Sequence, residues 1–129
     1  MTIGACGDNC DLCPRFMATK SGSEERLAEV ARLWLRLGLR DRLVSNDEIR
    51  CEGCRPENNC AYREQRDCAF GRKHANCGLC EDYPCKIVEK TLRRSADWKR
   101  KAEHCRDFAL IEEAFFRKKE NLDRISGER

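Results

Sequence analysis

The spacing of the cysteines constrains this chain more than any other feature of its sequence. Seven of the eleven cysteines fall within residues 51–85, and three more lie close together near the N-terminus. The first group comprises Cys51, Cys54, Cys60, Cys68, Cys77, Cys80 and Cys85, and the second comprises Cys6, Cys10 and Cys13. Cysteine at this density is typical of chains that are held together by disulfides or by metal ions.

The cellular compartment decides between these two kinds of cross-link. Residues 1–6 have neither the basic start nor the apolar run of a signal peptide, and no stretch approaches the ~18 apolar residues of a membrane span. We therefore expect a cytoplasmic protein without a membrane partner, in which thiols stay reduced. An odd number of cysteines also prevents complete pairing into disulfides. Metal–thiolate sites are the stronger interpretation.

A thin supply of apolar residues supports the same interpretation. Val, Ile, Leu and Phe together number 24 of 129 residues, close to the level at which chains become disordered, but the formal net charge is only +3. Bound metal can supply folding free energy that a small core lacks. We predict a small, metal-stabilised, mainly α protein with irregular cysteine-rich loops and little β structure. Residues 1–129 would form a single metal-binding domain with a C-terminal helical segment over 86–125.

Helical periodicity is clearest in residues 21–39. Apolar residues recur there at helical spacing, namely Leu27, Val30, Ala31, Trp34 and Leu37. Ser21 with Glu24 fits a capping box, and Ser23 is a competing N-cap. Gly38 is the predicted C-terminal stop. We expect this stripe, its tryptophan included, to be core rather than a ligand-stacking surface.

The flanking segments are predicted to be less regular. Residues 1–20 are rich in Gly, Asp and Asn and are expected to be loop-like, and residues 45–47 are predicted to form a turn. Residues 51–85 contain few apolar side chains, so we expect knuckles, turns and short irregular pieces held by metal.

Residues 86–125 return to a helix-forming composition. Pro84 suits the first turn of a helix, and Ser95 or Asp97 is predicted to cap a second helix. A further apolar stripe consists of Phe108, Ile111, Phe115, Leu122 and Ile125, and Gly127 is predicted to end it.

Two cysteine pairs have the two-residue gap of a zinc knuckle, and each contains a glycine that suits a sharp turn. These pairs, with their glycines, are Cys51–Gly53–Cys54 and Cys77–Gly78–Cys80. A two-residue gap lets both sulfurs face one ion at ~2.3 Å without strain. A four-thiolate site built from both pairs is the best single assignment.

The N-terminal cysteines supply three further thiolates and lack a fourth. Cys60, Cys68 and Cys85 are the candidates to complete this set, and we favour Cys85. Two four-cysteine sites would leave two of the ten cysteines over, so spacing alone leaves the partition open. His74 is a further candidate ligand, although a solvated loop histidine is favoured. Cys105 is expected to be a small buried residue.

Zinc is favoured among several cofactors and roles for these thiols. An iron–sulfur cluster remains an alternative, since four cysteines suit it equally, and redox-active thiols are a third interpretation. The spacing of the three N-terminal cysteines is also that of radical S-adenosylmethionine enzymes. Those enzymes need repeated strand–helix units, which this chain lacks.

Positive charge gathers in the C-terminal third. Residues 86–129 hold 13 Lys and Arg against 9 Asp and Glu, a net +4, whereas residues 1–85 carry a net −1. The basic run from Arg93 to Lys101 is a candidate nucleic-acid interface, although a solvated helix face is favoured. Arginines beside the cysteines would balance thiolate charge, since a zinc ion with four thiolates carries about −2.

The complete set of motifs resembles a widespread prokaryotic family of small cysteine-rich proteins known only as a domain of unknown function. The shared motifs, across about residues 4–92, are Cys6-Gly-x2-Cys10-x2-Cys13-Pro14, Cys51-x-Gly53-Cys54-Arg55, Arg66-x-Cys68-Ala69 and Cys77-Gly-x-Cys80-x3-Pro84-Cys85. The resemblance implies metal binding, with zinc as the expected metal, and no established activity. Family members often space the cysteines between Cys54 and Cys68 differently, so the resemblance supports Cys60 least.

These observations predict a zinc-binding protein of unknown biological role, with two or more ions. No nucleophile–base pair or phosphate-binding loop is present, and an all-cysteine ligand set is typical of closed, structural zinc sites, so we lean against an enzyme. We expect an interaction module with a protein partner. The alternatives are an iron–sulfur redox protein and a nucleic-acid-binding protein that uses the C-terminal basic helix.

Overall fold

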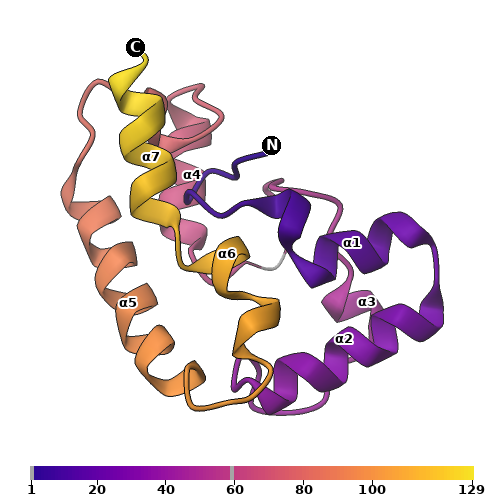
Figure 1. Ribbon diagram of the computed structural model, residues 1–129. Helices are drawn as coiled ribbons and strands as arrows, with labels where there is room; N and C mark the ends of the chain where they lie inside the picture. The colour runs from indigo at the N-terminus through magenta and orange to yellow at the C-terminus, as the bar shows by residue number, and fades with distance from the viewer. Residues whose placement is uncertain (1, 59) are drawn as a thin grey trace.

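The computed structural model describes residues 2–58 and 60–129 and is mainly helical (Figure 1). Within those residues the β structure is one isolated antiparallel bridge between Ile3 and Asn9. With η denoting a short 3-10 helix, the elements are η1 (Cys10–Leu12), α1 (Pro14–Ser21), α2 (Glu24–Arg36), α3 (Asn46–Ile49), α4 (Arg63–Gly71), η2 (Cys77–Leu79), α5 (Lys86–Ala102), η3 (Phe108–Leu110), α6 (Glu112–Phe115) and α7 (Lys118–Gly127). The predicted mainly α fold with little β structure is confirmed.

The helices form two groups with the N-terminal segment between them. Figure 1 shows α1, α2 and α3 together in one half of the molecule and α4, α5 and α7 in the other. Helix α2 contacts both α1 and α3, whereas α4 contacts α5 and α7 contacts η2. Helix α6 and the N-terminal segment lie where the two groups meet. Any site in this central region therefore draws on both groups.

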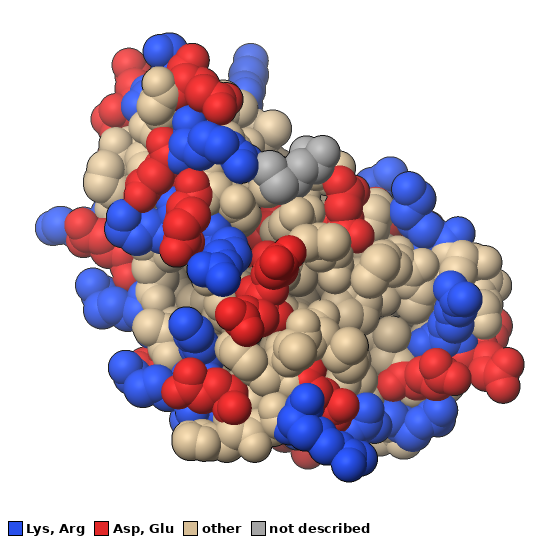
Figure 2. Space-filling model, in the orientation of Figure 1, with Lys and Arg blue, Asp and Glu red and all other residues tan. Residues whose placement is uncertain are grey.

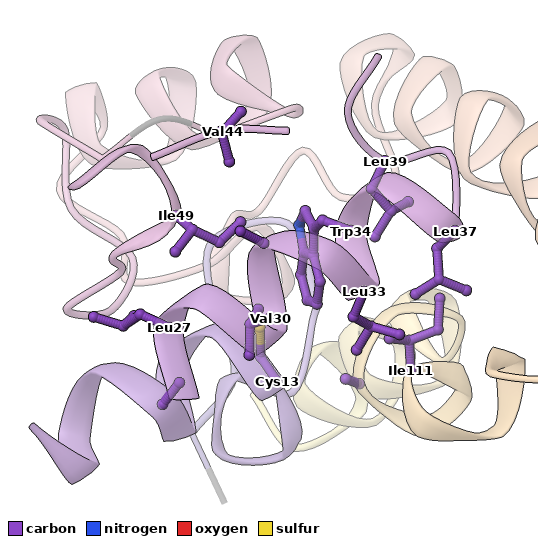
Figure 3. Close-up of a cluster of buried hydrophobic side chains, with 13 residues drawn as sticks. Cys13, Leu27, Val30, Leu33, Trp34, Leu37, Leu39, Val44, Ile49 and Ile111 are labelled. Atoms are coloured by element: carbon purple, nitrogen blue, oxygen red, sulfur yellow. The ribbon is translucent and has the colours of Figure 1, made fainter. Parts of the chain in front are cut away.

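The larger apolar cluster, core 1, is organised around α2. Its buried residues are Cys13, Ala18, Leu27, Val30, Ala31, Leu33, Trp34, Leu37, Leu39, Val44, Ile49, Ile111 and Ala114. Figure 3 shows the indole of Trp34 projecting from α2 into the middle of this cluster. Trp34 is 3% exposed, and its ring meets the ring of Phe115 edge-on with centroids 5.8 Å apart. The predicted core role of the α2 stripe is confirmed.

The ends of α2 follow the local signals in the sequence. The Ser23 hydroxyl accepts a backbone N–H from the first turn, so Ser23 is the N-cap. Ser21 is not the cap, because it is the last residue of α1. At the other end Gly38 adopts φ +75°, and the N–H of Leu39 donates to the carbonyl of Trp34 at 2.9 Å. The predicted stop at Gly38 is confirmed.

The loop predicted over residues 1–20 is wrong in its second half, where α1 forms. Pro14 opens this helix, and proline suits a first position because the missing N–H would have no partner there. On the next residue, Arg15 is buried, and its Nε donates to the carbonyl of Ile49 at 2.5 Å. This contact joins α1 to the end of α3.

Helices α3 and α4 replace the turn and the irregular segment that the sequence predicts. Ser45 caps α3 by accepting the N–H of Glu48 at 3.3 Å, so the predicted turn is a single helical turn. In α4 the buried residues are Gln65, Arg66 and Ala69. A buried face that is largely polar shows no apolar stripe, which explains why the periodicity does not reveal this helix.

Helix α5 is continuous, so the predicted start of a second helix at Ser95 or Asp97 is wrong. Ser95 is buried within the helix, and its hydroxyl lies 3.5 Å from Nζ of Lys118. Pro84 precedes the N-cap residue Cys85, so it does not occupy the first helical turn. None of the described helices, 17-residue α5 included, is long and apolar enough to cross a membrane.

The last part of the chain breaks into three short helices, η3, α6 and α7, instead of forming the single predicted stripe. Gly127 ends α7, as predicted. Helix α7 closes the smaller cluster, core 2, whose buried residues are Ala5, Ala69, Cys77, Val88 and Leu122. Core 2 thus joins the N-terminal segment, α4, η2, α5 and α7.

Candidate metal centre

The ten cysteines between residues 6 and 85 divide between two cavities. Cavity A, of about 120 Å³, is lined by Cys6, Cys10, Cys13, Cys51, Cys54 and Cys60. Cavity B, of about 240 Å³, is lined by Cys68, Cys77, Cys80 and Cys85. All eleven cysteines of the chain are free thiols.

This division differs from the predicted one. The structure does not bring the two knuckle pairs together, because Cys51 and Cys54 line cavity A whereas Cys77 and Cys80 line cavity B. It does not bring Cys85 to the N-terminal set either, since Cys85 lines cavity B. The helix that the sequence did not predict, α4, separates the two pairs along the chain.

Two of the C-x2-C segments have the same local backbone. In η1 the N–H of Cys13 donates to the carbonyl of Cys10 at 3.1 Å, and in η2 the N–H of Cys80 donates to the carbonyl of Cys77 at 3.1 Å. Each turn places its two cysteines on one cavity. Such a turn is what a two-residue gap needs if both sulfurs are to face one ion.

The glycines inside the two knuckle pairs serve different purposes. Gly53 adopts φ +113°, which is the left-handed conformation expected for a sharp turn. Gly78 needs no such φ. A Cβ at Gly78 would lie 2.9 Å from the carbonyl oxygen of Leu122 and 2.9 Å from Cβ of Ile125. Only glycine fits at position 78, because α7 packs directly on η2.

Two cysteines occupy the N-caps of helices. Cys13 precedes α1, and Cys85 precedes the long helix α5. The N-terminus of a helix carries partial positive charge, which favours thiolate over thiol. Cavity A and cavity B thus each contain one cysteine at such a position.

Backbone N–H groups also point at the sulfurs of cavity A. The N–H of Ala5 donates to Sγ of Cys54 at 3.4 Å, and the N–H of Tyr62 donates to Sγ of Cys60 at 3.4 Å. Hydrogen bonds of this kind stabilise the charged form of an acceptor. The N-terminal segment, which the sequence predicted as a turn-rich loop, supplies one of these donors.

Burial opposes ionisation of these thiols in the absence of a cation. It raises the pKa of Cys10 to about 12, and neighbouring Asp8, Cys13, Cys54 and Cys51 add to the effect. Burial likewise raises the pKa of Cys13 to about 12, although N–H groups at the start of α1 oppose the shift. Thiolates gathered in cavity A would therefore need a positive partner at neutral pH.

Cationic side chains in the wall of cavity A outnumber anionic ones. A single carboxylate, that of Asp8, lines the cavity together with Arg15, Arg40, Arg55, Arg66 and Lys118. Lys118 is 3% exposed, and its Nζ lies 2.5 Å from Oδ1 of Asp8. Burial would lower the pKa of Lys118, but Asp8 and Cys6 raise it above its ordinary value, so this lysine stays protonated.

Lys118 is not among the site residues that the sequence predicts. Its Nζ lies 4.7 Å from the centre of the Tyr62 ring, a cation–π contact inside the molecule. The signal was present in the spacing, because Lys118 falls three residues after Phe115 and four before Leu122, on the predicted apolar stripe. A charged residue at a core position is rarely buried without a partner, and here the partner is Asp8.

Cavity B has its own cationic neighbour. Nη1 of Arg72 lies 3.1 Å from Sγ of Cys80 and 2.6 Å from Oδ2 of Asp82. Burial raises the pKa of Cys77 to about 11, with contributions from Cys85, Cys68 and Cys80 and an opposing hydrogen bond from Gln65. Negative charge on the other three cysteines of cavity B would therefore oppose ionisation of Cys77.

The remaining candidates lie elsewhere. His74 lines neither cavity and is half-buried. Cys105, predicted to be a small buried residue, is half-buried and packs against core 1; its Sγ lies 3.9 Å from Oδ2 of Asp107. In the part of the chain that the structure describes, no three His, Cys, Asp or Glu side chains are gathered closely enough to form a ready-made metal site.

Comparisons with known proteins identify a family and leave its role open. A family model described as "Protein of unknown function (DUF3795)" matches residues 2–90. This match includes every cysteine of cavities A and B but neither α6 nor α7. No curated protein and no solved structure matches the chain.

Proposed function

Because the chain belongs to the DUF3795 family of proteins of unknown function, membership leaves its role open, and we propose from the site itself that it is a zinc-binding protein whose ions are structural. The observation that carries this proposal is the division of ten cysteines between two cavities, each with at least four thiols. Four thiolates complete the tetrahedral coordination of zinc and leave no position for a reacting water.

The donor set suits zinc in both chemistry and charge. Sulfurs in each cavity have hydrogen-bond donors close by, from backbone N–H groups in cavity A and from Arg72 in cavity B. The sulfur of cysteine moves about a single torsion, so thiols that line one cavity would converge on an ion by side-chain rotation. Helix N-termini and buried cations would offset the net charge of about −2 at each four-thiolate site.

The positions of the cavities support a structural role for the ions. The wall of cavity A includes Trp34 and Phe115, which belong to core 1, and Trp98 and Lys118, which come from α5 and α7. An ion held there would join the N-terminal segment, α1 and the loop before α4. An ion in cavity B would join α4, η2 and the start of α5. Metal binding would thereby add folding free energy to a chain with few apolar residues.

The contacts of the basic run give less support to the nucleic-acid alternative. Arg94 donates to the carbonyl of Ala61 at 3.3 Å and lies over the ring of Tyr62, and Arg100 pairs with Asp97. Figure 2 shows basic and acidic side chains interspersed over the visible face, without a large field of one sign. No observation favours this role over a metal-stabilised interaction module.

Elemental analysis and visible absorption of anaerobically purified protein test the zinc proposal. We expect zinc, no iron, and no absorption band in the visible. Cys80→Ser should reduce the zinc content, because it removes one ligand of cavity B. Cys105→Ser, which changes a thiol outside both cavities, is the matched control and should retain all of the zinc. Iron together with a visible band that bleaches on reduction would establish the iron–sulfur alternative instead.

A further inference from the structure

Cavity A contains two more thiols than one tetrahedral zinc site can use. Cys10, Cys13, Cys51 and Cys54 form two C-x2-C pairs, and Cys6 and Cys60 line the same cavity beside them. The sulfurs of Cys60 and Cys54 have the same kind of hydrogen bond, because each accepts a backbone N–H at 3.4 Å. Cys60 therefore resembles Cys54, a member of a C-x2-C pair, in the hydrogen bond that its sulfur accepts.

Within the cavity, the sulfurs of Cys10 and Cys54 lie against a common neighbour. A Cβ at Gly4 would lie 3.2 Å from Sγ of Cys10 and 3.7 Å from Sγ of Cys54, so both sulfurs lie against the same residue. The other four thiols, those of Cys6, Cys13, Cys51 and Cys60, line the same cavity.

A second zinc ion in this cavity would leave the net charge unchanged. One zinc with four thiolates and two neutral thiols carries about −2, and two zinc ions with six thiolates also carry −2. Entry of the second Zn²⁺ would form four new zinc–sulfur bonds, two to Cys6 and Cys60, whose thiols release two protons, and two to the Cys10 and Cys54 thiolates that already bind the first ion. Neither zinc nor sulfur changes oxidation state. Two ions with six cysteines are an established arrangement in other zinc modules.

We propose that cavity A holds a binuclear zinc cluster, in which Cys10 and Cys54 bridge the two ions. One ion would also bind Cys13 and Cys51, and the other would also bind Cys6 and Cys60, so each has four sulfurs. This inference rests on the proposed zinc function and extends it to a total of three ions per chain, two in cavity A and one in cavity B.

The positive lining of cavity A fits this cluster. Five cationic side chains line the cavity beside the sulfurs, and three of them, Arg55, Arg66 and Lys118, also pair with Glu52, Asp67 and Asp8. Arg66 is 2% exposed, and its Nη1 donates to the carbonyl of Asn58, two residues before Cys60. Arg66 thereby fixes Asn58, which is close in sequence to Cys60, a ligand of the proposed second zinc ion.

Native mass spectrometry of the zinc-reconstituted full chain counts the ions. We expect three in the unaltered protein, and two in Cys6→Ser and in Cys60→Ser. Cys68→Ser is the matched control for cavity B and should also retain two, both in cavity A. Two ions in the unaltered protein would overturn the binuclear cluster while leaving the zinc function intact. An absence of zinc would overturn both.

Cobalt substitution tests the adjacency of the two ions, first in the unaltered chain and then in Cys68→Ser. In a thiolate-bridged pair the spins of two Co²⁺ ions couple antiferromagnetically and their low-temperature EPR signal is lost. The fully loaded chain should therefore give the EPR intensity of one cobalt for every three bound, and Cys68→Ser should give almost none. An intensity equal to the total cobalt content would show isolated ions and overturn the proposal.

Discussion

At the scale of single residues, the least expected feature is the buried pair formed by Asp8 and Lys118. The pair joins the loop between Cys6 and Cys10 to the start of α7, with 2.5 Å between Oδ1 and Nζ. The Lys118 amine also donates to the carbonyl of Phe115 at 2.5 Å, so its charge is held by several groups. The pair therefore fixes the cysteine loop on a helix more than a hundred residues later in the chain.

We predict that Asp8→Asn lowers the free energy of unfolding by about 3–5 kcal/mol, because it leaves the Lys118 charge buried without its counterion. Urea denaturation followed by circular dichroism measures the change. Asp97→Asn, which breaks the exposed pair with Arg100, is the control and should change stability by no more than about 0.5 kcal/mol. Equal effects of the two substitutions would show that the buried pair has no special role.

At the scale of elements, the packing of α7 on η2 explains a glycine that turn chemistry does not. Gly78 lies inside a C-x2-C segment, where the sequence suggested a sharp turn, yet its backbone needs no positive φ. The carbonyl of Leu122 and the side chain of Ile125 occupy the space that a Cβ would need. In the N-terminal segment, Gly7 is confined in the same way, with the carbonyl of Lys118 2.9 Å from the position of a Cβ.

Gly78→Ala is therefore expected to be destabilising, by about 1–3 kcal/mol, because α7 would have to move away from η2. Gly71→Ala is the matched control. A Cβ at Gly71, the last residue of α4, meets nothing within 4 Å, so alanine there should be neutral or slightly stabilising. Thermal melts of the zinc-loaded proteins compare the two. A Gly78→Ala variant as stable as the Gly71→Ala variant would contradict the close packing.

At the scale of the whole molecule, the two cores are unequal. Core 1 has thirteen buried apolar residues around α2, whereas core 2 has five, one of them Cys77. Cavity B lies beside core 2, and three residues of that core, Ala69, Cys77 and Val88, line it. The half of the molecule that contains α4, α5 and α7 therefore has the smaller apolar contribution and, on our proposal, the greater dependence on metal.

This inequality predicts an ordered response to metal removal. With a strong chelator, backbone amides of α4 and α7 should lose hydrogen-exchange protection before those of α2, because α2 keeps its apolar contacts. Hydrogen exchange followed by mass spectrometry resolves these segments, and the unchelated protein is the reference. Protection that falls equally in all helices, or in none, would contradict the expected order.

Sequence patterns were sufficient wherever the deciding interactions are local. The stop of α2 at Gly38 and the left-handed turn at Gly53 each depend on contacts within a few residues, whereas at the start of α2 the sequence left Ser21 and Ser23 as competing caps. The apolar stripe of α2 was visible because one face of that helix is buried. The density of cysteines likewise indicates thiol chemistry, because it depends on residue type alone.

The division of the cysteines between the two cavities could not be predicted from local sequence patterns. It depends on which segments meet when α4 inserts between the two knuckle pairs, and α4 shows no apolar stripe because its buried face includes Gln65 and Arg66. The cationic wall of cavity A draws on α1, α4 and α7, which are distant in sequence. Residue type and spacing thus establish which chemistry is available. Long-range packing establishes which thiols share a cavity, because the sharing depends on contacts between distant segments that no local pattern encodes.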